Sequence, residues 1–244
     1  MRDLLLCIPF IFLQGNFKKK QLQHKRVQNA YELKYNGVKN NLQKHNLNPK
    51  TYSLYIRVFK YDGIVELWGK NTTSTTYKLF REYNICMSSG ELGPKRKQGD
   101  YQVPEGYYHI DRFNPNSNFH LSLGINYPNT SDKILGHKNK LGGDIFIHGD
   151  CITIGCVPLT DNEIRSFYVY CVEAINNGQS SISVTIFPAK MEGENSRFLN
   201  NLIKNSDTNN LWTDLQKGYT YFNTHKKLPN ISFLKNGRHH ISTP

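Results

Sequence analysis

The chain has 244 residues, enough for one catalytic domain of ordinary size with terminal extensions and a real hydrophobic core. Its 31 Lys and Arg residues against 19 Asp and Glu give a net charge of +12. Such a charge favours an anionic partner, which includes nucleic acid, anionic lipid and acidic cell-wall polymers; a basic, solvated surface is the alternative. Five cysteines are too few for a disulfide scaffold, and the sequence contains no internal repeat, P-loop or dinucleotide fingerprint.

The first 15 residues are typical of a secretory signal. Arg2 precedes an apolar run from Leu4 to Leu13, and polar residues follow this run. The run has the length of a signal h-region and is too short to span a bilayer comfortably. We therefore predict a signal peptide at residues 1–15, export to the periplasm or cell envelope, and no integral membrane span.

Residues 16–48 are predicted to form a basic N-terminal extension. The segment begins with three lysines, Lys18 to Lys20, and then carries apolar residues at approximately helical spacing. We expect a weakly amphipathic helix, interrupted near Gly37, that packs on the domain. An arm that binds the cell wall or a membrane surface is the alternative.

Residues 49–190 contain the patterns of a β-rich domain. Alternating or continuous apolar runs predict strands at Thr51–Phe59, Ile64–Trp68, Tyr77–Met87, Tyr107–Asp111, Phe119–Ile125, Asp144–Ile147 and Ile182–Phe187. Asp62-Gly63 predicts a two-residue hairpin turn between the first two. Residues 93–106 form a loop rich in Gly and Pro. Its cations, Lys95 to Lys97, are expected to be solvated, and contact with substrate carboxylates is the alternative.

Helices are predicted mainly after residue 160. Thr160 and Glu163 have the spacing of a capping box, and Asn177-Gly178 ends the apolar face that follows them. Residues 191–244 are predicted to hold two short helices, within residues 195–225, and a tail that docks as a strand. The whole pattern indicates a mainly β (α+β) domain with peripheral helices.

The stretch 146–159 carries the most chemistry. His148-Gly149 follows a predicted strand, and Cys156 comes directly after Gly155. A thiol acts as a nucleophile only as thiolate, so a nearby imidazole such as His148 gives Cys156 a base. We therefore expect an acidic Cys156 thiol. Gly155 lets the backbone bend so that peptide N–H groups could face a developing oxyanion.

Other interpretations of these residues remain open. Cys156 could be a small buried hydrophobe, and Cys151 could pair with Cys156 in a disulfide. His148, Cys151 and Cys156 could also bind zinc, although no further Cys or His pair follows at finger-like spacing. Cys86, in a predicted strand, and Cys171, on a predicted helix face, are expected to be core residues.

The pattern His148-Gly149, then Thr153-x-Gly155-Cys156, resembles the HG…[ST]xGC signature of the L,D-transpeptidase catalytic domain, the YkuD-type family. Upstream motifs are similar to its YafK-like murein L,D-transpeptidase branch: Leu92-Gly93-Pro94-Lys95, Gly99-Asp100, Pro104-Glu105-Gly106-Tyr107-Tyr108, Phe119-His120-Leu121-Ser122-Leu123 and Asn126-Tyr127-Pro128-Asn129. Many family members carry Arg two residues after the nucleophile, where this chain has Pro158. The gap from His148 to Cys156 is also shorter than usual, and both features are similar to the YafK-like branch.

The resemblance implies an L,D-transpeptidase-like β-sandwich with Cys156 and His148 at one sheet edge. It implies an exported peptidoglycan enzyme in which Cys156 attacks a stem peptide, releases D-Ala and forms a thioester. An amine acceptor, which is a second stem peptide or a wall-anchored protein, then resolves this thioester. His148 would act as the base and the Gly149 carbonyl would orient its ring, while the N–H groups of Gly155 and Cys156 would bind the oxyanion.

His120 and Thr153 are the further candidates for substrate contact. No metal, organic cofactor or nucleic-acid partner is expected. Two alternatives stay open: a cysteine hydrolase that uses the same site on wall-linked peptides, and a non-catalytic basic module that binds the cell wall.

Overall fold

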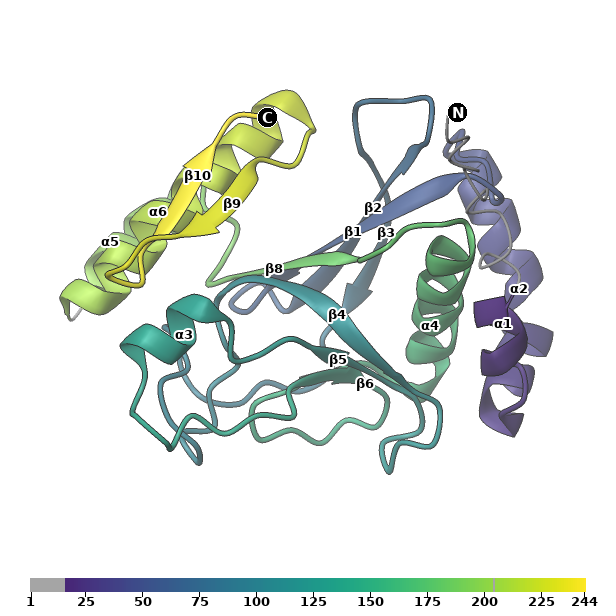
Figure 1. The fold of residues 1–244 in the computed structure, drawn as a ribbon, viewed down its shortest axis with the longest axis horizontal. Coiled ribbons are helices and arrows are strands. Elements are labelled where there is room, and N and C mark those ends of the chain that lie inside the picture. Colours follow the sequence, from purple (N-terminus) through teal and green to yellow (C-terminus); the bar gives the residue numbers. More distant parts are fainter. Residues whose placement is uncertain (1–15, 204) are drawn as a thin grey trace, which may run out of the picture.

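A computed structural model of the chain describes residues 16–203 and 205–244. Its centre is one curled sheet with helices on both sides, so the predicted α+β class is confirmed (Figure 1). The helices α1, α2 and α4 lie together on one side, and α5, α6 and the C-terminal hairpin lie on the other. The predicted signal at residues 1–15 lies outside the described residues.

The sheet has eight strands in the order β3-β2-β1-β8-β4-β5-β6-β7. Their bounds are β1 Tyr52–Phe59, β2 Ile64–Asn71, β3 Lys78–Asn84, β4 Gly106–Asn114, β5 Ser122–Ile125, β6 Phe146–His148, β7 Val157–Pro158 and β8 Ser183–Phe187. Pairing is parallel between β1 and β8 and between β6 and β7, and antiparallel elsewhere. An irregularity in β4 between Ile110 and Arg112 lies where that strand passes from one half of the sheet to the other.

The first hairpin is confirmed, with a longer loop than predicted. Phe59 pairs with Ile64, so the loop comprises residues 60–63 and only Gly63 of it has a positive φ, 65°. A second difference concerns the strand predicted at Phe119–Ile125, which begins only at Ser122. His120 is therefore not in a strand; it lies before β5 with a left-handed φ of 64°.

The N-terminal extension forms two helices, α1 (Asn16–Gln21) and α2 (Lys25–Lys44), packed against α4 (Asp161–Asn176). The predicted packed helix is confirmed, and its buried face comprises Val27, Ala30, Val38 and Leu42. The break falls at residues 22–24 and not at Gly37. A helical glycine costs about 1 kcal/mol, which burial of the neighbouring Val38 and of Leu42 outweighs. Thr160 and Glu163 form the predicted capping box of α4.

The C-terminal segment covers the other side of the sheet with α5 (Gly193–Leu202) and α6 (Ser206–His225). Helix α6 is longer than predicted because its buried face continues to Phe222. The Arg57 guanidinium holds α6 to the sheet: it donates to Asn223 and packs on rings from both sides, Phe59, Trp68, Phe187, Tyr219 and Phe222.

The tail, predicted to dock as a strand, forms two strands, β9 (Asn230–Phe233) and β10 (His239–Ser242), which pair with each other as a hairpin. Arg238 ties it to α6 through Asp214, a buried carboxylate. A short helix that the sequence analysis did not identify, α3 (Thr130–Leu135), begins at an Asn129 capping box. Among the helices of the described residues, none has the length and hydrophobicity to cross a membrane.

Candidate active site

His148 and Cys156 lie at neighbouring strand ends on one edge of the sheet. His148 is the last residue of β6, and Cys156 immediately precedes β7. The parallel register pairs Ile147 with Val157, and both of these side chains are in the core. Because side chains alternate along strands, His148 and Cys156 both project from the opposite face. The sheet therefore brings the predicted base and nucleophile to the same surface.

The imidazole of His148 is held on two sides. Its Nδ1 lies within hydrogen-bond distance of the Gly149 carbonyl oxygen, and the Phe119 ring packs on it with centroids 4.7 Å apart. Burial lowers the pKa of His148 below its ordinary value, although the Gly149 bond and the charge of Asp150 oppose that shift. With Nδ1 donating to the carbonyl, Nε2 is the nitrogen left for a proton.

The thiol of Cys156 contacts backbone. Its Sγ accepts from the Phe146 N–H at 3.4 Å and lies 3.7 Å from the Asp144 carbonyl oxygen. No hydrogen bond joins it to His148 among the described residues, which is common before substrate tightens a catalytic site. The expectation of an acidic thiol is wrong for this state, because burial raises the pKa of Cys156. Near neutral pH the pair is thus thiol and neutral imidazole.

Thr153 shapes the turn that presents the thiol. Its hydroxyl accepts from the N–H groups of Gly155, at 3.2 Å, and Cys156, at 2.8 Å, and donates to the Cys156 carbonyl at 2.9 Å. Gly155 has a φ of 134°, and a Cβ there would lie 3.1 Å from the Gln102 carbonyl oxygen. The turn therefore needs glycine at this position.

These contacts correct two expectations. The Thr153 hydroxyl serves the backbone and not a substrate in this state. The N–H groups of Gly155 and Cys156, predicted to bind an oxyanion, are both occupied by that hydroxyl. For either N–H group to bind an oxyanion, the Thr153 hydroxyl has to rotate away from it, or the N–H hydrogen has to be shared between the hydroxyl and the oxyanion.

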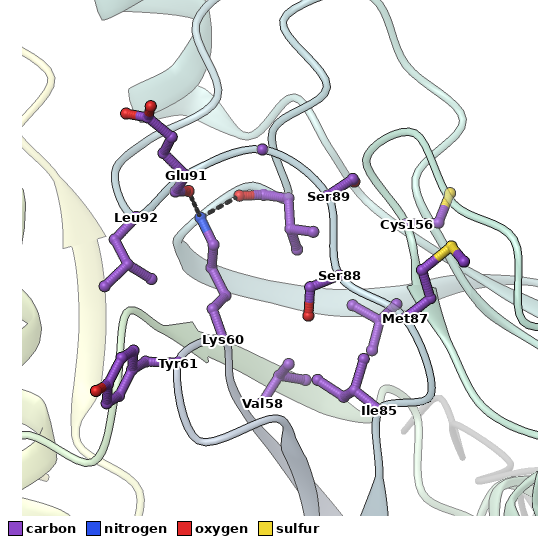
Figure 2. A pocket seen from close by; sticks show the side chains of 13 residues that line it. Val58, Lys60, Tyr61, Ile85, Met87, Ser88, Ser89, Glu91, Leu92 and Cys156 are labelled. Carbon is purple, nitrogen blue, oxygen red and sulfur yellow. Dashed lines mark hydrogen bonds between the residues drawn. The ribbon is translucent and has the colours of Figure 1, made fainter.

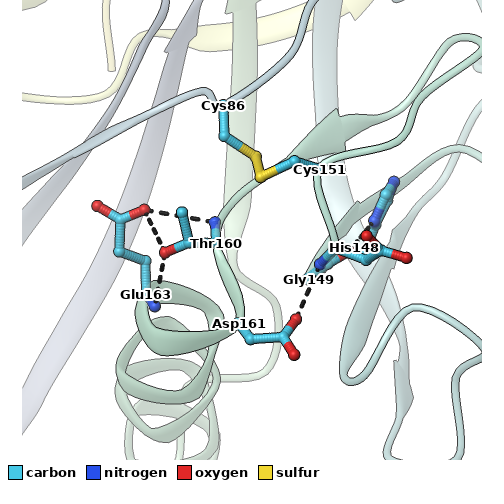
Figure 3. Close-up of a disulfide and its surroundings, with 8 residues drawn as sticks. Cys86, His148, Gly149, Cys151, Thr160, Asp161 and Glu163 are labelled. Atoms are coloured by element: carbon cyan, nitrogen blue, oxygen red, sulfur yellow. Dashed lines mark hydrogen bonds between the residues drawn. A yellow bond between two sulfur atoms is a disulfide. The ribbon is translucent and has the colours of Figure 1, made fainter.

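A disulfide between Cys86 and Cys151 links the segment after β3 to the loop between His148 and Cys156 (Figure 3). Cys86 is therefore not a free core thiol as predicted, whereas Cys171 is buried and free. The bond also overturns the Cys151–Cys156 disulfide and the zinc site, since Cys151 is not available as a thiolate. In the described residues no group of three or more His, Cys, Asp or Glu is placed to hold a metal ion.

Two hydrogen bonds hold the loop between His148 and Cys156 and the strand β7 that follows it. The Asp150 N–H donates to Asp161, at the start of α4, at 2.9 Å, and the Cys86 N–H donates to the Pro158 carbonyl at 3.1 Å. The disulfide and the Asp150 bond therefore hold the start of the loop, and the Cys86 N–H holds β7, the strand that follows the loop.

His120 lies beside Gly149 and the start of α4. Its Nδ1 is 3.9 Å from Asp161, and its Nε2 is buried with no hydrogen-bond partner among the described residues. The loop that carries His120 and Phe119 is held by Arg26 of α2, which donates to the carbonyls of Ser117 and His120. The N-terminal extension thus holds the loop whose Phe119 ring packs on His148.

A cavity of about 300 Å³ opens beside Cys156 (Figure 2). Its walls are mostly apolar and come from β1, β7 and the segments around residues 85–92 and 103, with Val58, Ile85, Met87, Leu92, Val103 and Val157 among them. Lys60 crosses it, but its ammonium is bound by Glu105 and by the carbonyls of Glu91, Gly93 and Val103.

The cationic loop residues are less exposed than predicted. Lys95 is buried and paired with Asp100, while Arg96 is paired with Asp132 and Asp207. Of the three, only Lys97 is exposed. Arg96 therefore holds the loop to α3 and α6, and Lys95 holds two parts of the loop together.

Sequence reasoning missed Phe119, Arg26 and the Cys86–Cys151 bond. An aromatic directly before His120 in a family motif was a usable signal for Phe119. The other two depend on contacts over long sequence separations, 94 residues from Arg26 to His120 and 65 for the disulfide, which no local pattern reveals.

The sequence is similar to proteins of the L,D-transpeptidase family. The family model of the L,D-transpeptidase catalytic domain, YkuD, matches residues 53–186. The proteins named "Putative L,D-transpeptidase YafK" from Escherichia coli K12 and O157:H7 are each 35% identical over 193 residues, 78% of this chain and 74% of theirs.

Among solved structures, the helical cell shape determining protein Pgp2 from Campylobacter jejuni is 18% identical, with a TM-score of 0.45 and coverage of 75% of this chain and 73% of that one. Bd1075 from Bdellovibrio bacteriovorus is 22% identical, with a TM-score of 0.41 and coverage of 62% and 56%. With a family match over more than half of its length and relatives similar along most of theirs, the chain belongs to the L,D-transpeptidase catalytic domain family.

Proposed function

We propose that the protein is an exported peptidoglycan L,D-transpeptidase with Cys156 as nucleophile and His148 as base. The observation that carries the proposal is the position of both residues on one face of adjacent strand ends, together with a cavity that Cys156 lines. Membership of the family supplies the substrate class, the stem peptides of peptidoglycan.

In the proposed reaction, His148 Nε2 removes the thiol proton as Cys156 Sγ attacks the carbonyl on the L-centre of the diamino acid. Because the resting pair is neutral, the proton moves only when the attack begins. The C–N bond to D-Ala then breaks, and the imidazolium protonates the departing amine. The neutral imidazole that remains deprotonates an acceptor amine, which attacks the thioester and frees the thiol.

The disulfide supports export. Structural disulfides persist in oxidising compartments and are rare where glutathione keeps thiols reduced, so the Cys86–Cys151 bond fits a protein of the cell envelope. The apolar run at residues 4–13 supports the same location. Fractionation of the native host and N-terminal sequencing test it, and full-length protein confined to the cytosol would contradict it.

A hydrolase that uses the same thioester is the second candidate. Cys156 is partly exposed at the rim of an open cavity, so water reaches the atom that would carry the acyl group. Transfer and hydrolysis share every step up to the thioester and differ only in the group that resolves it.

One experiment separates these candidates. Purified protein is incubated with defined tetrapeptide muropeptides, with and without an amine acceptor, and the products are identified by mass spectrometry. Cross-linked product that depends on the acceptor supports transfer, whereas tripeptide alone in the presence of acceptor indicates hydrolysis. No product from wild type, with binding retained, would indicate a non-catalytic wall-binding module.

A further inference from the structure

One row of residues crosses four segments of the sheet at the level of the thiol. Arg112 on β4 pairs with Gly124 on β5, and Gly124 pairs with Phe146 on β6. The parallel register of β6 and β7 sets Cys156 level with Phe146, whose N–H donates to the thiol. The row therefore leads from the nucleophile to a guanidinium.

The Arg112 guanidinium lies over the ring of Phe146. Its Cζ is 4.9 Å from the centroid of the Phe146 ring, on the strand next to Cys156. Gly124 on β5 leaves room for the Arg112 side chain, because a Cβ at this position would lie only 2.8 Å from Arg112 Nε. Strands are about 4.8 Å apart, so roughly one to two strand spacings separate the guanidinium from the thiol.

The present partners of Arg112 are exposed carboxylates. Asp144 accepts from Nη1 at 2.9 Å and its side chain is 78% exposed, while Asp111 lies 3.2 Å from Nε. Ion pairs this exposed contribute about 1 kcal/mol or less, so an incoming carboxylate competes with them readily. The Arg112 side chain is itself 46% exposed, whereas those of Lys60 and Lys95 are buried and paired with Glu105 and Asp100.

We infer that Arg112 binds the C-terminal carboxylate of the donor tetrapeptide, and this inference rests on the proposed function. That carboxylate lies one residue, about 3.5 Å, beyond the attacked carbonyl. The contacts from the thiol to this carbonyl and from the carboxylate to the guanidinium add about 3 Å each, so the total of about 10 Å is close to two strand spacings. A guanidinium holds a carboxylate through two parallel hydrogen bonds, which would also fix the direction of the peptide along the row.

The test compares two peptides, the tetrapeptide with a free C-terminal carboxylate and the same peptide as its C-terminal amide. Wild type should prefer the carboxylate roughly ten- to hundredfold in kcat/KM, as expected for one charge-assisted pair. Arg112→Ala should lose that preference, mainly through a higher KM for the carboxylate, and Arg112→Lys should keep part of it. Arg197→Ala, at an exposed arginine of α5, is the matched control and should behave as wild type.

Asp144→Asn gives a prediction of opposite sign. Removing the competing carboxylate should lower KM for the free-carboxylate peptide and so increase the preference for it over the amide, whatever change in kcat the two peptides share. Asn suits the left-handed φ of 55° at this position, so the backbone is retained. A higher KM for the carboxylate peptide in this variant would contradict the inference.

Binding measurements keep the inference separate from the reaction. If wild type turns over neither peptide, the proposed function fails, yet calorimetry of both peptides with the Cys156→Ala protein still tests Arg112. Equal loss of carboxylate preference in activity and in binding supports the assignment. An Arg112→Ala protein that retains the full preference for the carboxylate would overturn it.

Discussion

Replacing both Cys86 and Cys151 with alanine should destabilise the protein by about 4 kcal/mol. The bond closes a loop with a sequence separation of 65 residues, and cross-linking a loop of that size lowers the entropy of the unfolded chain by about 14 cal/mol/K. At 25 °C this amounts to about 4 kcal/mol. The double variant is the clean perturbation, because a single replacement leaves a free thiol near Cys156.

Activity should also fall, since Cys151 lies in the loop between His148 and Cys156. The bonds from Asp150 to Asp161 and from Cys86 N–H to Pro158 remain, so the loop is loosened and not released. Misplacement of reacting groups by about 1 Å costs up to 100-fold, and we expect kcat to drop roughly tenfold to that limit.

Urea unfolding followed by tryptophan fluorescence measures the first quantity, and steady-state kinetics the second. Cys171→Ala, which removes a buried thiol without cutting a cross-link, is the control and should cost about 1 kcal/mol. Dithiothreitol should lower the stability and activity of wild type to those of the double variant and leave that variant unchanged. A loss below about 1 kcal/mol with full activity would refute the reasoning.

Three further predictions concern single sites. The double variant of Cys156→Ala and His148→Ala should be as inactive as Cys156→Ala alone, while His148→Ala alone should lower kcat on the order of a thousandfold; additive losses in steady-state assays would argue against one catalytic unit. Thr153→Val should lower kcat by about 100-fold and Thr153→Ser should restore most of it, because only a hydroxyl orders the turn; equal rates in single-turnover assays would rule this out. Burial lowers the pKa of His239 to about 4, so the unfolded chain takes up a proton below about pH 6.5 before the folded one does. His239→Phe should therefore remove about 3 kcal/mol of stability loss between pH 7 and pH 4, and urea titrations that show the same loss in both proteins would contradict the assignment.

Much of the fold follows from short-range patterns. The capping box at Thr160 and Glu163 and the alternation on both sides of Gly63 are local signals, and both elements appear where predicted. The helical spacing from Val27 to Leu42 is local too, and it correctly indicated a buried face. Elements whose length depends on a distant partner were less accessible: α6 continues because Arg57 and the sheet cover its last turns.

The site shows the same division. His148 and Cys156 could be chosen from their flanking residues, because a strand end before one and a glycine before the other are visible in the sequence. Their protonation states could not be predicted, since they depend on burial by residues such as Phe119, which comes from the loop before β5. The role of Thr153 was equally hidden, because only the folded turn shows that its hydroxyl faces the backbone.

The parallel pairing of β6 with β7 determines which face of the sheet carries the Cys156 thiol. Parallel neighbouring strands are ordinarily joined by crossovers of a dozen or more residues, whereas residues 149–156 alone join this pair. A one-residue shift in the pairing of β6 with β7 would turn Cys156 to the opposite face of the sheet, whereas the side chains of Ile152 and Ile154 in the connection are exposed. The pairing of Ile147 with Val157, rather than the length of the connection, therefore keeps the thiol on the same side of the sheet as His148.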